Sequence, residues 1–175
     1  MKIAIIGYSG SGKSTLARLF SERYGIEVMH MDCVHWLPGW VVRAEEDKQR
    51  IVREFLDANE SWVIDGNYPK LCYERRLEEA NLIVEMLFNR FACYRRAWKR
   101  YRTYKGRSRP DMTEGCDEVI DRAFTKWILF TGRTKARRRE FSDIAERYPG
   151  KTVVIRNQKQ LTAYKKKIES GGPAL

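Results

Sequence analysis

The chain has 175 residues, 43% of them hydrophobic and 33% charged, which is typical of one compact globular domain. No apolar run approaches the roughly 20 residues that a membrane-spanning helix needs, and the apolar start is too short for a signal peptide. Four isolated cysteines and two histidines argue against a disulfide framework, a zinc site and a Ser-His-Asp triad. We therefore expect a cytoplasmic protein.

The net charge of +11 is unevenly distributed. Residues 89–109 hold nine Lys or Arg, five aromatic side chains and no acid, and residues 126–139 hold six further Lys or Arg. The rest of the chain is mildly acidic. Two basic blocks on such a body predict a localised anion site and not a general binder of polyanions.

Strand and helix patterns alternate along the chain. Apolar, β-branched runs predict strands at residues 2–6, 26–30, 62–64, 82–88 and 152–155. Amphipathic spacing predicts helices at residues 13–24, 43–58, 71–80, 91–104, 118–148 with a bend near Gly132, and 158–168. This order predicts an α/β fold in which helices cover both faces of a parallel sheet. We expect one domain over residues 1–170 and a disordered tail over residues 171–175.

The aromatic residues of the helix at 91–104 recur at helical spacing. Phe91, Tyr94, Trp98 and Tyr101 lie three or four positions apart, so they share one face. Such a stripe predicts packing against the core. Arg96 and Arg100 are also four apart and share another face, which would point them at one common target.

Residues 7–15 read GYSGSGKST and match the phosphate-binding pattern G-x-x-x-x-G-K-[ST] between a strand and a helix. Glycines let backbone N–H groups surround phosphate oxygens, and the helix presents its positive end to the same anion. Lys13 is expected to reach the β- and γ-phosphates, Ser14 to bind Mg²⁺ and Thr15 to bind the α-phosphate. The pattern thus predicts ATP and Mg²⁺ as cofactors, bound through Gly7, Ser9, Gly10, Ser11, Gly12, Lys13, Ser14 and Thr15.

Four segments carry a resemblance: GYSGSGKST, MDCVHWLPGW, WVIDGNY and the block from NRF to RPDM. Together they resemble the bacterial family of DNA topology modulation proteins, FlaR-like, which looks like a branch of the adenylate kinase and shikimate kinase group of P-loop phosphotransferases. The resemblance covers nearly the whole chain. It implies a five-stranded parallel sheet in the order 2-3-1-4-5, an acceptor-binding segment at about 32–60, a helical lid at about 101–117, and a monomer.

The resemblance also implies roles for individual residues. Asp65, followed by Gly66, matches the Asp-Gly whose carboxylate supports Mg²⁺ through water, but the motif continues without the arginine that holds a substrate phosphate. That departure puts a nucleoside monophosphate acceptor in doubt. Arg96 and Arg100 match the two lid arginines, of which the first lies against the base and the second reaches the phosphates. The lid has no cysteine quartet, so no zinc is implied.

Other candidates flank the predicted strand ends. Asp32 would accept a proton from the acceptor or order the Mg²⁺ shell, or else it only caps a turn. Trp36, with His35 and Trp40 beside it, would stack on the acceptor or simply anchor its loop. Further candidates are Asn67 and Tyr68 as acceptor contacts, Asn157 beside the adenine, and Arg133 and Arg137 as a second pair of phosphate ligands; Arg138 and Arg139 read as surface residues.

Two functions fit these features. The first is an ATP-Mg²⁺-dependent kinase that transfers the γ-phosphoryl group to a nucleoside-like or other small acceptor, with Lys13, Asp32, Arg96, Arg100, Arg133 and Arg137 as its catalytic residues. The second is a nucleic-acid-associated regulator that uses ATP as a switch, or a kinase of polynucleotide ends. The sequence favours the first, because a lid that faces ATP already accounts for the basic blocks, and no recognisable nucleic-acid module is present.

Overall fold

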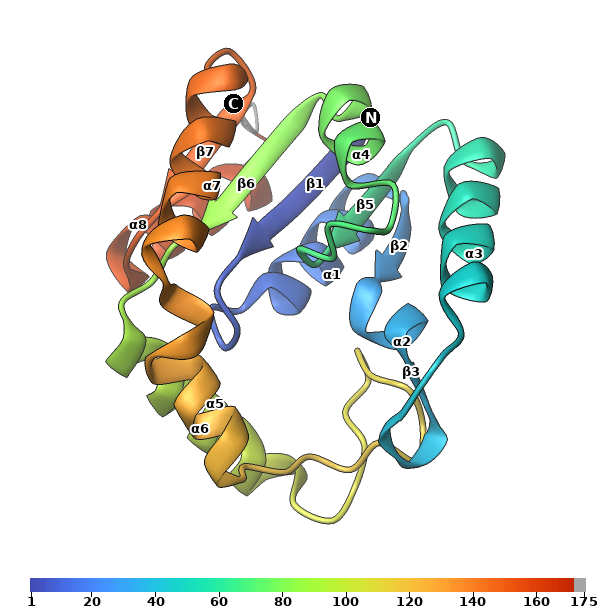
Figure 1. The fold of residues 1–175 in the computed structure, drawn as a ribbon. Coiled ribbons are helices and arrows are strands. Elements are labelled where there is room, and N and C mark those ends of the chain that lie inside the picture. Colours follow the sequence, from blue (N-terminus) through green and yellow to red (C-terminus); the bar gives the residue numbers. More distant parts are fainter. Residues whose placement is uncertain (172–175) are drawn as a thin grey trace.

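The computed structural model describes residues 1–171, and its centre is a five-stranded sheet in the order β2-β5-β1-β6-β7 (Figure 1). The strands are β1 (Lys2–Gly7), β2 (Glu27–His30), β5 (Trp62–Asp65), β6 (Leu82–Met86) and β7 (Thr152–Ile155). All four neighbouring pairs are parallel. Counted along the chain, this is the order 2-3-1-4-5, so the predicted fold class and strand order are confirmed.

Burial explains why these strands sit where they do. The central strands β1, β5 and β6 are almost fully buried, as their continuous apolar sequences predict for strands covered on both faces. The outer strands β2 and β7 are mostly half-buried. Parallel pairing brings the carboxyl ends of β1 and β5 together, with Ile5 in register with Asp65. The end of β1 and the loop after β5 therefore meet at one edge of the sheet.

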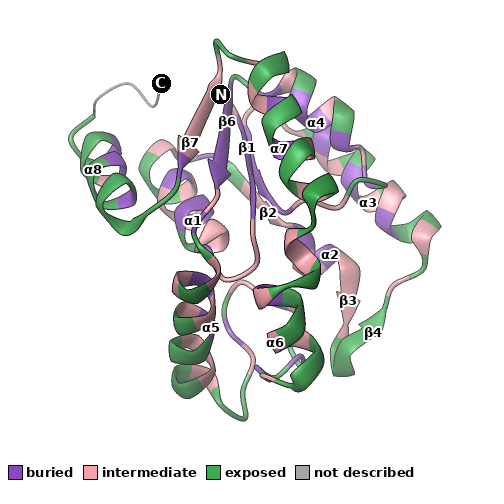
Figure 2. Cartoon of the chain, turned by 60° about the vertical axis from the view of Figure 1, so that its left-hand side comes forward, coloured by how far each residue is buried: buried purple, intermediate pink, exposed green. Residues whose placement is uncertain are grey.

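Helices form the two outer layers (Figures 1 and 2). On one face, α1 (Lys13–Tyr24), α5 (Arg90–Tyr104) and α8 (Gln158–Glu169) contribute to a core with Phe20 at its centre. On the other face, α3 (Glu45–Ala58), α4 (Tyr73–Glu79) and α7 (Lys135–Arg147) enclose a second core around Trp62. This is the predicted three-layer arrangement.

A small hairpin unit lies beyond β2 and was not predicted. The short helix α2 (Met31–His35) leads into β3 (Trp36–Leu37), a 3-10 turn at Pro38–Trp40 and β4 (Val41–Val42), which pairs antiparallel with β3. These elements are too short to produce a periodic pattern in the sequence. They project from the carboxyl edge of the sheet and form the first part of the predicted acceptor-binding segment of about 32–60.

The predicted single helix over 118–148 is wrong. The segment instead contains α6 (Arg122–Leu129), a 3-10 turn at Thr131–Arg133 and then α7. Asp121 caps the start of α6 and Thr134 caps the start of α7 through their side-chain oxygens. The expected bend at Gly132 marks the break, since a Cβ there would lie 2.8 Å from the carbonyl oxygen of Trp127.

The predicted packing of the aromatic stripe on α5 is also wrong for two of its four residues. Phe91 is 73% exposed and Trp98 is 45% exposed. The fully buried residues of α5 are the small Cys93 and Ala97, which let the helix approach the loop after β1 closely. The helix thus buries a narrow face of small residues and leaves large aromatic side chains at the surface.

Two remaining observations concern the chain as a whole. Within residues 1–171, the structure has no helix that is both long enough and apolar enough to cross a membrane. The predicted disordered tail of 171–175 lies outside the described residues, except for Gly171.

Candidate active site

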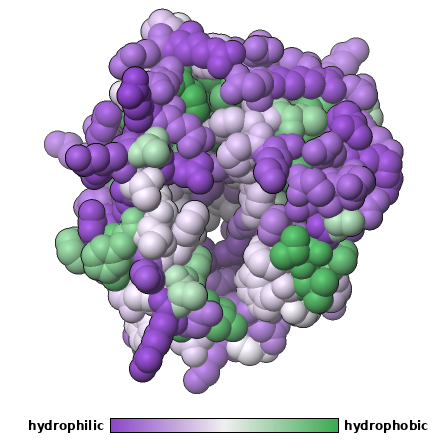
Figure 3. Space-filling model, in the orientation of Figure 1, coloured by the Kyte–Doolittle hydropathy of each residue, from purple (hydrophilic) through white to green (hydrophobic). Residues whose placement is uncertain are grey.

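A cavity of about 1310 Å³ opens at the carboxyl edge of the sheet. Figure 3 shows the surface hollowed near its centre, where the ribbon of Figure 1 leaves a gap between α5 and α6 on one side and the hairpin unit on the other. We name two parts of it. The P-loop half is lined by residues 7–15 and by Arg96, Gln158, Leu161 and Lys165. The carboxylate half is lined by Asp32, His35, Trp36, Trp40, Tyr68, Arg109, Asp111, Met112 and Glu118.

The loop from β1 to α1 has the backbone shape that its glycines permit. Gly10 has φ of +74° and Gly12 has φ of +97°, in the left-handed region. A Cβ on Gly10 would lie 2.6 Å from the carbonyl oxygen of Cys93, so α5 packs directly onto the loop. The loop leads into α1, whose positive N-terminal end faces the cavity.

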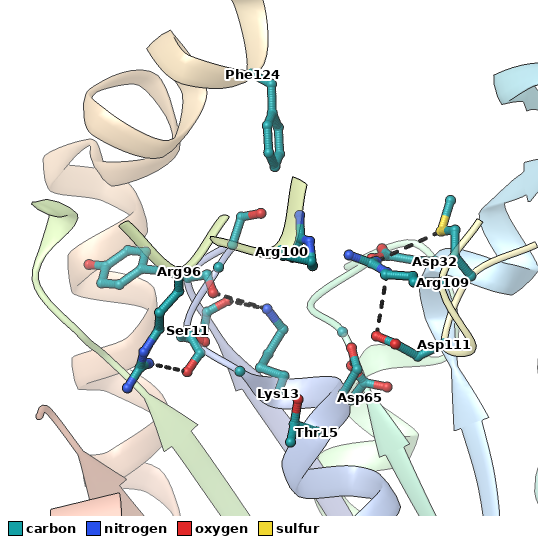
Figure 4. Close-up of a pocket in the computed structure, with 18 of the residues that line it drawn as sticks. Ser11, Lys13, Thr15, Asp32, Asp65, Arg96, Arg100, Arg109, Asp111 and Phe124 are labelled. Carbon is teal, nitrogen blue, oxygen red and sulfur yellow. Dashed lines mark hydrogen bonds and ion pairs between the residues drawn. The ribbon is translucent and has the colours of Figure 1, made fainter. Parts of the chain in front are cut away.

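Lys13 stands at the centre of this half, as Figure 4 shows. Its Nζ donates to the carbonyl oxygens of Gly7 and Tyr8, both at 3.1 Å. Burial lowers the pKa of the Lys13 ammonium, while the nearby carboxylates of Asp32 and Asp65 act in the opposite direction. A half-buried ammonium that lines the cavity and donates to two carbonyl groups is well suited to a polyanionic ligand.

Ser14 and Asp65 meet at the floor of the cavity. The Ser14 hydroxyl donates to Asp65 Oδ2 at 2.8 Å, and His30 Nδ1 donates to Asp65 Oδ1. Burial alone would lower the pKa of His30, but its hydrogen bond to Asp65 and that carboxylate's charge raise it. His30 was not singled out from the sequence, because a strand-end histidine carries no motif.

These oxygens fit a small, hard cation. Mg²⁺ in phosphotransferases takes one or two protein oxygens and completes its shell with water and substrate phosphates. A hydroxyl and a carboxylate beside the loop supply that donor set, whereas residues 1–171 contain no cluster of three or more His, Cys, Asp or Glu that would form a full protein cage.

Asn67 ties the two strand ends together. Its Oδ1 accepts from the Gly7 N–H at 2.9 Å and its Nδ2 donates to the Gly7 carbonyl at 3.0 Å. Both polar groups of the predicted acceptor contact are thus used to position the loop. The buried Arg76 supports the same segment, donating to the carbonyl oxygens of Gly66, Asn67 and Tyr68.

Asp32 lies in α2 and is held from two sides. The Tyr68 hydroxyl donates to its Oδ1 at 2.7 Å, and Arg109 Nη2 donates to its Oδ2 at 3.3 Å. Burial alone would raise the pKa of Asp32, but the Tyr68 hydrogen bond and the charges of Arg109 and Lys13 lower it. The structure therefore brings the predicted pair Asp32 and Tyr68 into direct contact.

Arg109 is a cavity residue that no sequence motif indicated. It falls within the predicted lid of about 101–117, but its side chain is only 8% exposed and lies in the cavity next to Asp32 and Asp111 (Figure 4). It forms ion pairs with Asp32 at 3.3 Å, Asp111 at 3.4 Å and Glu118 at 3.4 Å. Burial alone would lower the pKa of Arg109, but these carboxylates raise it. The acidic residues within 111–118 are the sequence feature that could have indicated these ion pairs.

The loop that carries Arg109 is fastened to the hairpin unit. Thr113 Oγ1 donates to the Trp36 carbonyl at 2.7 Å, and the Trp40 indole donates to the Asp117 carbonyl at 3.1 Å. The Gly39 N–H donates to the Gly115 carbonyl at 2.9 Å. The predicted lid and the predicted acceptor segment therefore form one wall of the cavity.

The lid arginines of α5 line the cavity at different places. Arg96 Nη1 donates to the Ser11 carbonyl and its Nη2 to Gln158 Oε1, both at 2.6 Å, and its guanidinium lies 3.8 Å from the Phe88 ring centroid. Arg100 Nε donates to Glu118 Oε1 at 2.6 Å. Burial lowers the pKa of both guanidinium groups. Figure 4 shows Arg100 above Lys13, between the two halves.

The second predicted arginine pair is split. Arg137 lines the cavity, with its Nη1 bonded to Glu140 at 2.9 Å. Arg133 is not among the residues that line the cavity: its Nη1 donates to the Phe88 carbonyl at 2.9 Å and it lies 3.8 Å over the Tyr8 ring. The 3-10 turn directs these two side chains differently, which the continuous helix of the prediction did not allow.

Asn157 also lies outside the cavity lining. Its Oδ1 accepts from the Gln160 N–H at 3.0 Å and so caps the start of α8, while the next residue, Gln158, lines the cavity. The predicted site residues that do line the cavity are Gly7, Ser9, Gly10, Ser11, Gly12, Lys13, Ser14, Thr15, Asp32, Trp36, Asp65, Asn67, Tyr68, Arg96, Arg100 and Arg137.

Solved structures with the same fold include P-loop kinases. The shikimate kinase from Acinetobacter baumannii, solved with shikimate, matches with a TM-score of 0.51 and 13% identity over 97% of this chain and 90% of its own. An uncharacterized protein from Eubacterium ventriosum ATCC 27560 matches with a TM-score of 0.51 and 16% identity over 98% of this chain and 97% of its own.

A gluconokinase from Sinorhizobium meliloti 1021 has a TM-score of 0.48 and 16% identity over 97% of this chain and 90% of its own. No protein-family model and no curated protein matches the sequence. The comparisons with the two structures at a TM-score of 0.51 establish the fold: this chain has the three-layer α/β architecture found in shikimate kinase.

Proposed function

We propose that this protein is an ATP-Mg²⁺-dependent kinase that phosphorylates a hydroxyl group of a small acceptor. One observation carries the proposal: a single cavity contains both the glycine-rich loop with Lys13 and the carboxylate of Asp32. Its volume of about 1310 Å³ exceeds the roughly 300–1,000 Å³ of ordinary ligand pockets, so it has room for a nucleotide and a second substrate.

The P-loop half would hold the nucleotide. Backbone N–H groups of Ser9, Gly10 and Gly12 and the Lys13 ammonium bind the phosphates, and Thr15 contributes a hydroxyl beside them. Arg96 and Gln158 lie at the side of this half where α8 begins, next to Leu161, and form a site for the base. When bound, Mg²⁺ would be held by Ser14, with Asp65 acting through water, and would neutralise charge on the phosphates.

The transfer step needs few groups. The acceptor oxygen forms a bond to the γ-phosphorus while the bond from that phosphorus to the β,γ-bridging oxygen breaks, releasing ADP. Asp32 is ionised and takes the hydroxyl proton, which then passes to solvent. Lys13, Arg100 and Arg137 stabilise the charge that develops on the moving phosphoryl group.

Within this proposal the chain is one kinase domain over residues 1–170, with a lid at about 101–117 and an acceptor segment at about 32–60. The adenylate kinase-like subgroup and the FlaR-like resemblance remain part of the proposal, supported by the sequence segments that carry them. A monomer in the cytoplasm is the state we predict for it.

The test is acceptor-dependent ADP release. Purified protein should release ADP steadily when Mg-ATP and a suitable hydroxyl compound are both present, and Lys13→Ala should reduce that rate at least about a thousandfold, in line with the loss of a main charge ligand. Arg139→Ala is the matched control, because Arg139 is 84% exposed on α7. A folded wild-type protein that does not bind Mg-ATP would exclude the kinase.

A second function is favoured by one surface. The outer side of α5 exposes Phe91 and Trp98 together with Arg95 and Arg102, and basic residues interleaved with aromatic ones suit single-stranded nucleic acid. Fluorescence anisotropy with a labelled oligonucleotide tests it: binding should weaken steeply with salt and with the variant Arg95→Glu/Arg102→Glu. Absence of binding at low salt removes this function.

A further inference from the structure

The charge of the carboxylate half limits what the acceptor can be. Arg109 faces Asp32, Asp111 and Glu118, each within 3.4 Å. Glu118 is shared with Arg100 at 2.6 Å. Three carboxylates therefore surround two guanidinium groups, with the Lys13 ammonium also acting on Asp32, and the positive charge of Arg109 is already compensated within the protein.

This arrangement is unfavourable for an anionic substrate. A phosphate or carboxylate group bound beside Arg109 would also lie beside three acids, whose repulsion is strong in a partly buried site. Proteins that recognise such groups instead present guanidinium groups with unpaired donors. A hydroxyl group faces no such penalty, because it can donate to a carboxylate and accept from a guanidinium N–H.

The carboxylate half can form hydrogen bonds with hydroxyl groups of a substrate. The two bonds to Asp32, one to each oxygen, leave lone pairs on the side of the carboxylate that faces the cavity. The Asp32 side chain is 45% exposed, so a substrate can reach it, and the Arg109 guanidinium that holds it lines the same cavity. Carboxylate and guanidinium groups thus lie side by side, which suits neighbouring hydroxyl groups on one molecule.

The remaining wall is aromatic. Trp36 contacts His35 edge to face with ring centroids 4.6 Å apart, and it contacts Trp40 in the same way at 5.4 Å. Tyr68 lies 5.0 Å from His35. Such a wall packs against the C–H face of a ring or against a flat ring, and it offers no further charge.

We propose that the acceptor is an uncharged polyhydroxyl compound with one apolar face, such as a sugar, a sugar alcohol or an unphosphorylated nucleoside. This inference rests on the proposed kinase function and narrows it. It predicts that the chain differs from the shikimate kinase whose fold it shares, because shikimate carries a carboxylate.

Matched pairs of acceptors test the inference. ADP release is measured at saturating Mg-ATP with glucitol against gluconate, shikimate methyl ester against shikimate, and adenosine and thymidine against their 5′-monophosphates. The uncharged members should be preferred at least about tenfold in kcat/KM, as expected when repulsion acts on one member of a pair. Faster turnover of the anionic members would overturn the inference while leaving the kinase function in place.

A second measurement decides the matter even if no compound in the panel is phosphorylated. The fluorescence of Trp36 and Trp40 is isolated as the difference between wild type and Trp36→Phe/Trp40→Phe, at constant ionic strength and with Mg-ADP present. Caesium ions should quench this difference signal about threefold more efficiently than iodide, with acrylamide as the uncharged reference, because the surrounding potential is negative. Iodide quenching that equals or exceeds caesium quenching would overturn the inference.

Failure of the proposed kinase function and failure of the inference about the acceptor give different results. Loss of the kinase function appears as absent Mg-ATP binding, whereas loss of this inference appears as a preference for anions in the panel or in the quenching. Glu118→Gln adds a direct check on the charge, since removing one carboxylate should raise iodide quenching relative to caesium quenching.

Discussion

The two halves of the cavity are built in different ways. In the P-loop half, backbone groups contiguous in the chain form most of the lining, and contacts such as those of Asn67 to Gly7 and Arg96 to Ser11 end on that backbone. In the carboxylate half, side chains from α2, the loop after β5 and the loop at 105–121 meet each other through a hydrogen bond and ion pairs. The first half is encoded locally, and the second depends on the whole fold.

The largest effect should come from the carboxylate half. Arg109→Met leaves Asp32, Asp111 and Glu118 facing one another without their common cation, and we expect a loss of roughly 3 kcal/mol in unfolding free energy, because breaking a buried ion pair strands its partners. Chemical denaturation measures it. Arg107→Ala, on the exposed side of the same loop, is the control; equal losses for both would contradict the arrangement.

The corresponding change in the P-loop half should weaken nucleotide binding more than it lowers the stability of the fold. Gly10→Ala places a Cβ at 2.6 Å from the Cys93 carbonyl with φ at +74°, so we expect about a hundredfold weaker Mg-ATP binding by calorimetry, from strain of about 1–3 kcal/mol in the loop. Gly25→Ala has φ of +62° but open space around it, so it shares the backbone strain without the clash. Equal nucleotide affinity in both variants would mean that the close approach of α5 to the loop has no effect on binding.

The predicted pair Arg133 and Arg137 allows another test, because only Arg137 lines the cavity. Arg137→Gln removes a cavity-lining charge and should lower kcat about tenfold with little change in stability. Arg133→Gln removes the bond to the Phe88 carbonyl and the stacking on Tyr8, so it should instead cost about 1–2 kcal/mol of stability. The reverse pattern would mean that Arg133 reaches the phosphates.

The last prediction concerns Glu85, which lies in β6 outside both halves. Burial raises its pKa to about 8, and its Oε1 has no hydrogen-bond partner. The folded protein therefore keeps a proton that the unfolded chain loses above its ordinary pKa near 4.5. Stability should fall as pH rises from about 5 to 8, by at most about 1.4 kcal/mol per pH unit. Denaturation of Glu85→Gln should show a shallower pH dependence; an unchanged slope would contradict the raised pKa.

The difference between the halves also explains what the sequence could predict. The strands and the residues of GYSGSGKST follow from continuous patterns, whereas the strand order came from the resemblance to the P-loop phosphotransferase group, and the structure confirms the fold and that order. Arg109 was not predicted, because Asp32 lies 77 residues away and only the fold brings the two together. Its other partners, Asp111 and Glu118, are 2 and 9 residues away. The hairpin at 36–42 was missed because two-residue strands have no period to detect.

The basic segment of residues 89–109 shows the same limit. Helical spacing grouped Arg96 and Arg100 on one side of α5, and both line the cavity. The aromatic stripe was assigned to the core, but Phe91 and Trp98 in it are exposed. Periodicity tells which residues share a face but not which face is buried. Here small residues, Cys93 and Ala97, take the buried position because the helix lies directly on the loop.

Calorimetric titration of Mg-ATP into the wild-type protein and into Lys13→Ala tests the central claim most directly. We predict one site per chain in the wild type, tighter with Mg²⁺ than without it, and a loss of affinity of at least about a hundredfold in the variant, since Lys13 is the cation at the centre of the P-loop half. Equal affinity in both proteins, or no binding to folded wild-type protein, would contradict it.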